Sequence, residues 1–264
     1  MIPTRSIIEG VAPGVYFTDK GYLREVALGN VPGASLVTKF GRNPGSAMTT
    51  LEDVWGAAGS RSTLTSEATM EVVAAVAADD AAGLGARSVI IQGVNRALLP
   101  VQEKIATNGG GTSDPSIQKF FRVYRAWVAD AGANNVANTG LVSVRVSGAG
   151  LLQASILAGI GQSETSHFTV PINKRALLVY VLPTVASNKT TDVTMWQRQE
   201  LWRTAVPYTS KRKVMGWSGI DLASPTSLDV PVLFPGGTDI WFTTYAAAGS
   251  TVTEVTYSLI LYDI

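Results

Sequence analysis

Short runs of β-branched and aromatic residues, separated by Gly and Pro, return along the second half of this chain at roughly the 8–12-residue spacing typical of a β-sandwich or barrel. In the last run Val255, Tyr257, Leu259 and Leu261 fall on one side of the predicted strand. No run combines sustained helical periodicity with end caps, so the sequence predicts an all-β protein. The predicted strands are 167–172, 176–182, 192–203, 214–220, 228–234, 239–246 and 252–262.

The first half contains three further strand candidates and one ambiguous stretch. Residues 120–128 are rich in aromatic and β-branched types, residues 141–146 place three valines on one face, and residues 87–92 form a β-branched run. The alanines of 68–78 favour a helix, whereas its Thr and Val residues favour a strand. We expect 68–78 and 87–92 to form a hairpin.

The chain divides by composition into three parts. Gly and Pro recur too often in the segment 1–34 for a helix, which predicts an extended arm with a short strand at 14–18. The arm either packs on its own domain or docks on a neighbouring subunit as an added strand. Between Ala131 and Asn173 only Arg145 and Glu164 are charged. We therefore expect an N-terminal arm (1–34) and two jelly-roll or immunoglobulin-like β-sandwich domains (35–149 and 150–264).

Composition excludes several classes of function. Of 264 residues, 46% are hydrophobic, which is too many for a disordered chain. The net charge of +1 provides no general attraction to nucleic acid or anionic lipid. The absence of Cys excludes disulfides, thiolate metal sites and cysteine nucleophiles, and the single His cannot supply a typical transition-metal site. We therefore predict no cofactor, no metal site and no specific nucleic-acid partner.

No targeting or membrane-spanning segment is evident in the sequence. The segment 1–30 carries several charged side chains and no apolar core of signal-peptide length. The most apolar window, 149–161, contains Gln153 and four glycines, and is shorter than the ~20 residues of a membrane helix. The expectation is a soluble protein without a membrane partner.

Motifs for nucleophilic or nucleotide chemistry are weak. His167 is the only imidazole available as a base, and no Gly-x-Ser-x-Gly elbow accompanies it. The run 83–88 resembles a dinucleotide loop superficially, but Ser88 replaces the third Gly and a predicted strand follows instead of a helix. We interpret this run as a turn.

Two other groups of residues remain as candidates for chemistry. Glycoside cleavage needs only two carboxylates, which can be distant in sequence, and the acids available are Glu52, Asp53, Asp79, Asp80, Asp192 and Asp239. Asp79 and Asp80 also allow a calcium site, although no Asp-x-Asp-x-Asp loop is present. The basic run 211–213 lies near Arg198, Arg203, Trp196, Trp202 and Trp217, and we favour a solvated strand face with the Trp rings in the core over a nucleic-acid surface. No catalytic residue is assigned.

Six short segments stand out along most of the chain after Lys39: 39–43 (KFGRN), 52–55 (EDVW), 80–94 (DAAGLGARSVIIQGV), 120–128 (FFRVYRAWV), 232–240 (VLFPGGTDI) and 261–263 (LYD). Together they resemble virion structural proteins of tailed bacteriophages, and their order and spacing carry the resemblance more than any single motif. The N-terminal segment 1–34 and the Ala-rich stretch around Val73 depart from the pattern.

This resemblance implies a head or tail structural protein without catalytic residues. Low charge, short strands and an apolar arm also favour self-association through exposed edges and faces. We expect a non-enzymatic capsid decoration or cement protein, a homo-oligomer with a trimer favoured, bound to the major capsid protein or other virion proteins and assembled in the bacterial host cytoplasm. The alternatives are a tail, collar or fibre-base component, a host-glycan-binding virion protein, or a polysaccharide-cleaving enzyme.

Overall fold

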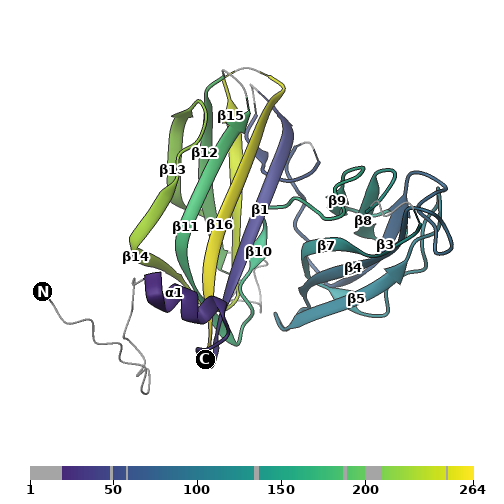
Figure 1. Cartoon of the computed structure of the whole chain (residues 1–264), viewed down its shortest axis with the longest axis horizontal. Helices are drawn as coiled ribbons and strands as arrows, with labels where there is room; N and C mark the ends of the chain where they lie inside the picture. Colours follow the sequence, from purple (N-terminus) through teal and green to yellow (C-terminus); the bar gives the residue numbers. More distant parts are fainter. Residues whose placement is uncertain are drawn as a thin grey trace, which may run out of the picture.

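A computed structural model of the chain consists almost entirely of antiparallel strands (Figure 1). It describes residues 20–47, 50–57, 59–133, 137–186, 189–199, 210–247 and 249–264. The larger part is a two-sheet sandwich, the sandwich unit. One sheet has the order β1 (Ala34–Ser46), β16 (Thr251–Asp263), β11 (Lys174–Ala186), β14 (Thr226–Phe234). The other has the order β10 (Phe168–Thr169), β15 (Thr238–Ala246), β12 (Thr191–Gln199), β13 (Arg212–Ile220), with β2 (Glu52–Asp53) also paired to β15.

Alternation along β16 builds the core of the sandwich unit. The predicted inward residues Val255, Tyr257 and Leu259 are fully buried, which confirms the expected face of this strand. The ring of Tyr257 packs 5.1 Å from that of Phe242 on the facing sheet, and the Tyr257 hydroxyl donates a hydrogen bond to the Ser166 carbonyl. Burial of several large side chains at about 1.5–3 kcal/mol each holds the sheets face to face.

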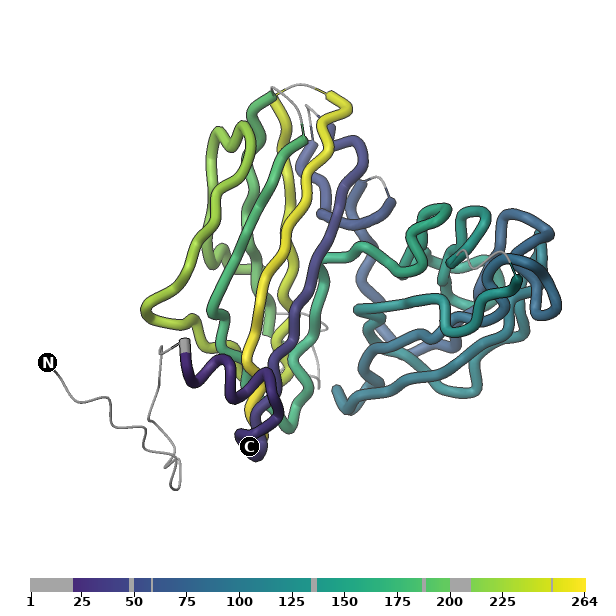
Figure 2. The backbone as a smooth tube through the Cα atoms, viewed as in Figure 1, coloured from purple at the N-terminus to yellow at the C-terminus, as the bar shows by residue number. Residues whose placement is uncertain are grey.

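Residues 68–156 form a second unit with its own core, the inserted unit. Its sheets have the orders β6 (Lys119–Phe120), β3 (Ala68–Ala74), β8 (Val142–Val146), β9 (Leu152–Ile156), and β5 (Pro100–Ala106), β4 (Ala86–Val94), β7 (Arg122–Ala131). Met70, Ile91 and Phe120 are fully buried between these sheets. The chain enters and leaves beside the sandwich unit, where Trp55 bridges to Thr165 (Figure 2).

The strand pairing differs from the expected domains 35–149 and 150–264. β1 pairs with β16 over nearly its whole length, from Ala34 opposite Tyr262 to Ser46 opposite Thr251. Residues 34–55 therefore complete the C-terminal sandwich, and the inserted unit interrupts it. The composition shift near Gly150 falls inside the connection between β8 and β9, two neighbouring strands of one sheet. It therefore does not mark a boundary between domains.

The prediction of an extended arm over residues 1–34 is wrong for residues 20–27. Residues 20–27 form a helix, α1 (Lys20–Ala27), followed by Gly29 at φ +77°, a left-handed conformation that suits the end of a helix. Val26 packs against Leu177 and Ile260 on the outer face of the first sheet. The helix therefore packs on its own sandwich. This agrees with the alternative in which the N-terminal segment packs on its own domain instead of docking on a neighbouring subunit. The strand expected at 14–18 lies outside the described residues.

The hairpin expected between 68–78 and 87–92 is also wrong, although both strands are present. β3 pairs with β6 and β8, whereas β4 pairs with β5 and β7 in the other sheet. The turn between them is fixed by the buried Asp79 carboxylate, which accepts hydrogen bonds from the backbone N–H groups of Ala86, Thr139 and Gly140. Those bonds direct the chain from one sheet to the other.

Candidate functional site

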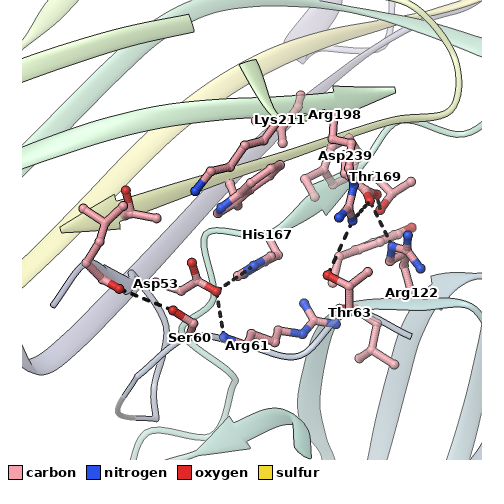
Figure 3. Close-up of a pocket in the computed structure, with 17 residues that line it drawn as sticks. Asp53, Ser60, Arg61, Thr63, Arg122, His167, Thr169, Arg198, Lys211 and Asp239 are labelled. Atoms are coloured by element: carbon pink, nitrogen blue, oxygen red, sulfur yellow. Dashed lines mark hydrogen bonds and ion pairs between the residues drawn. The ribbon is translucent and has the colours of Figure 1, made fainter. Parts of the chain in front are cut away.

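A pocket of about 270 Å³ lies where the two units meet (Figure 3). The sandwich unit contributes side chains from β2, β10, β12 and β15, and the inserted unit contributes the start of β7. Apolar side chains line part of this surface, and the charged and titratable residues on it are Arg61, Arg122, Arg198, Lys211, Asp53, Asp239 and His167.

Asp239 on β15 is the centre of an ion-pair network across the junction. Its carboxylate accepts hydrogen bonds from Arg122 Nε at 3.0 Å, Arg198 Nη2 at 2.8 Å and Thr169 Oγ1 at 2.7 Å. Burial alone would raise the pKa of Asp239, but the positive charges of the two arginines and these hydrogen bonds outweigh it, so the pKa lies below its usual value. Asp239 is therefore an anion that joins the inserted unit, through Arg122, to the sandwich.

His167 lies between Asp53 and Thr165. Its Nε2 is 3.4 Å from Asp53 Oδ2, its Nδ1 is 3.2 Å from Thr165 Oγ1, and its ring is parallel to that of Trp241 at 6.4 Å. Burial lowers the pKa of His167, and the nearby Asp53 offsets only part of this effect. The imidazole therefore holds its proton less tightly than an exposed histidine does.

Arg61 extends between the two sheets of the inserted unit. One guanidinium nitrogen donates to the Val123 carbonyl at 2.6 Å and to Gln153 Oε1 at 3.0 Å, both uncharged acceptors. Burial and the positive charge of Arg122 lower the pKa of Arg61 to about 10, although Asp53 and Asp239 act in the opposite direction. This guanidinium stays charged at neutral pH in an environment that destabilises its charge.

Lys39, at the middle of β1, is a buried lysine beside the pocket. Its Nζ donates to the Tyr124 carbonyl on β7 and lies 5.8 Å from the centre of the Tyr124 ring. Burial is the main cause that lowers the pKa of Lys39 to about 7, and the positive charges of Arg125 and Arg61 act in the same direction. Lys39 therefore links the two units through a carbonyl instead of a carboxylate.

The pocket lacks the pattern expected of a glycoside hydrolase or a serine-type hydrolase. The structure does bring together two of the candidate acids, Asp53 and Asp239, but the pKa of each is lowered, whereas a general acid needs a raised pKa. Ser60 Oγ donates to the Leu51 carbonyl at 3.4 Å, and Thr165, the hydroxyl beside His167, is 2% exposed.

The other candidate acids serve local backbone structure. Asp79 holds the turn described above, and Asp80 accepts from the N–H groups of Ala82 and Gly109. Glu52 accepts from Asn43 and from the Ala47 N–H, and Asp192 accepts from the Gly219 N–H. Within the described ranges no group of three or more His, Cys, Asp or Glu is placed to hold a metal, and no helix is long and apolar enough to cross a membrane.

All three residues of the basic run 211–213 are exposed, and only Lys211 also lines the pocket. The Lys211 Nζ is 4.5 Å from the centre of the Trp196 ring. Trp217 packs against the sandwich core, as expected. The candidates Arg203 and Trp202 lie outside the described residues.

Two arginines of the pocket, Arg61 and Arg122, were not among the residues singled out from the sequence. The sequence signal for Arg122 is its position as a charged residue inside the aromatic run 120–128.

Comparison with known proteins identifies no family. No family model matches the chain, and no curated protein matches its sequence. Among solved structures, the infectious bursal disease virus Gx strain aligns with a TM-score of 0.26 and 8% identity, covering 92% of this chain and 76% of that chain. The VP2 subviral particle of the same virus aligns with a TM-score of 0.19 and 11% identity, covering 92% and 82%. The similarity to viral capsid proteins is weak and does not assign the chain to a family.

Proposed function

We propose that this chain is a non-enzymatic structural component of a virion, most specifically a capsid decoration protein of a tailed phage that self-associates and binds capsid subunits. The resemblance of segments 39–43, 120–128 and 232–240 to phage virion proteins supports the class. The lowered pKa values of Asp53 and Asp239 argue against a polysaccharide-cleaving role, because neither carboxyl is suited to donate a proton.

One open side of the sandwich carries the assembly part of this proposal. β14 and β13 end their sheets, and each pairs along one edge only among the described strands. Val230 on β14 is 82% exposed, and Leu233 on the same strand and Leu222 before it are also exposed. Exposed apolar side chains on an end strand are suited to pack against another chain, and we assign this surface to side-chain contact with a second copy of this protein, because Asp229 and Pro231 beside Val230 disfavour an added strand.

The role of such a protein is mechanical. An interface of ordinary size buries about 1,600 Å² in total, and repetition over a closed shell multiplies its contribution. Copies that join each other and neighbouring capsid subunits would stabilise the head against internal pressure. The copy number in purified particles tests this role: many copies spread over the shell support decoration, whereas a few copies at one vertex support the tail, collar or fibre-base alternative.

Replacing Val230 by Glu is expected to weaken self-association by about tenfold or more, because the substitution places a charge on the apolar edge. Analytical ultracentrifugation of the purified chain measures the change. Leu84→Glu is the matched control, since Leu84 is 52% exposed but lies in a turn of the inserted unit. An equal effect of the two substitutions, or a wild-type chain that stays monomeric at all concentrations, would contradict the assigned edge.

A further inference from the structure

The described lining of the junction pocket includes four cationic side chains, Arg61, Arg122, Arg198 and Lys211, and two carboxylates, Asp53 and Asp239. Arg122 and Arg198 both donate hydrogen bonds to the Asp239 carboxylate. The Arg61 guanidinium donates to the uncharged acceptors on Val123 and Gln153, while the Arg61 backbone N–H donates to the Asp53 carboxylate at 2.8 Å. The four cations outnumber the two carboxylates of the described lining, so an anion near Arg61 and Lys211 would meet a positive local field.

Lys211 completes the cationic surface from the sandwich side. It precedes β13, lines the pocket, and has its Nζ over the Trp196 ring instead of in an ion pair with a described carboxylate. Figure 3 shows Lys211 extending from the sandwich side of the pocket and Arg61 from the opposite side, with His167 and Asp53 between them in this view. A ligand that reaches both cations would contact the sandwich unit and the connection that leads into the inserted unit.

The size and lining of the pocket limit the ligand. A volume of about 270 Å³ is just below the usual range for small-molecule sites, roughly 300–1,000 Å³. The lining includes the hydroxyls of Ser60, Thr63 and Thr243 and the ring of Trp241. These groups suit a compact polar molecule with hydroxyls better than an extended apolar one.

We propose that this pocket binds a small organic acid, whose carboxylate or other oxyanion group lies between Arg61 and Lys211 and whose body is no larger than one sugar ring. Arginine suits this role because its planar guanidinium binds oxyanions through two parallel hydrogen bonds. The proposal is independent of the assembly role, because the pocket lies at the unit junction and the proposed assembly surface is the β13–β14 edge.

Isothermal titration calorimetry of the full chain at low ionic strength tests the proposal with three probes. Glucuronate carries a carboxylate on a sugar ring, glucose is its neutral counterpart, and inorganic phosphate is an oxyanion alone. We expect saturable binding of glucuronate and at least about tenfold weaker binding of glucose. Phosphate binding as tight as that of glucuronate assigns the affinity to the oxyanion, and weaker phosphate binding assigns part of it to the ring.

Charge reversal at the pocket entrance provides the matched variants. Lys211→Glu is expected to weaken glucuronate binding by about tenfold or more, whereas Arg212→Glu, at the next and exposed position, is expected to change it less than about twofold. Both substitutions are at exposed residues, so the fold should tolerate them, and circular dichroism checks this. No saturable binding of glucuronate or phosphate, equal binding of glucose, or equal effects of the two variants would overturn the proposal.

Discussion

Replacing Asp239 by Asn is expected to lower the free energy of unfolding by about 3 kcal/mol at neutral pH. The substitution keeps the shape of the side chain but removes the negative charge that Arg122 and Arg198 share, and Arg122 is 5% exposed. Urea denaturation followed by Trp fluorescence measures the change. Asp229→Asn on β14 is the matched control, because Asp229 is exposed, and it is expected to change stability by less than about 0.5 kcal/mol.

Acid should reduce the difference between wild type and Asp239→Asn. The pKa of Asp239 is lowered in the folded state, so the unfolded chain binds the proton more tightly and the stabilisation is present above the unfolded pKa of about 3.9. It is lost as the pH falls through the lower folded pKa. A difference that stays constant down to pH 2, or a variant as stable as wild type at pH 7, would contradict the role of this carboxylate.

Lys39 is expected to make stability rise from pH 7 to pH 10, by about 3–4 kcal/mol over this window. Burial lowers its pKa from 10.5 to about 7, so the unfolded chain binds more protons between these values and the folded state gains stability as the pH rises. Lys39→Met removes the titrating group, and its unfolding free energy should lack this rise. Comparing the two proteins at each pH cancels the groups that they share.

Lys213→Met is the control for this measurement, because Lys213 is exposed and its removal should leave the pH profile unchanged. A Lys39→Met profile parallel to that of wild type between pH 7 and pH 10 would show that Lys39 keeps an ordinary pKa in the folded protein. A parallel Lys213→Met profile together with a flattened Lys39→Met profile would assign the pH dependence to the buried lysine.

The strands were predictable from sequence because their signal is local. The alternation at Val255, Tyr257 and Leu259 lies within one short segment, and the structure buries all three. The partner of a strand has no such local signature. Nothing in the segment 34–46 indicates that β1 pairs with β16, the last strand of the chain, so the division at 149 placed the two strands in separate domains. The sequence does not indicate the helix α1, because its eight residues, which include Gly21, are too few to show a helical period.

The candidate site was predictable only by residue type. Asp53 and Asp239 were among the candidate acids, but their common pocket depends on the pairing of β2 with β15. The guanidinium of Arg122 is opposite Asp239 because a neighbouring unit faces the sandwich, and this arrangement has no sequence period. The aromatic run 120–128 contains two arginines, and the sequence does not indicate that Arg122 forms a buried ion pair whereas Arg125 bonds to Gln162.

The long separation between β1 and β16 has a consequence for biosynthesis. Ribosomes add about 5–20 residues per second, so the last strand would follow the first by about 10–40 seconds. During that interval the inserted unit, whose strands all pair among themselves, can fold as it emerges. Meanwhile β1, which carries Leu36 and Phe40, has no strand to pair with, because β16 is its only partner among the described strands. Aggregation during expression should therefore respond to chaperone supply and translation speed more than to the final stability of the protein.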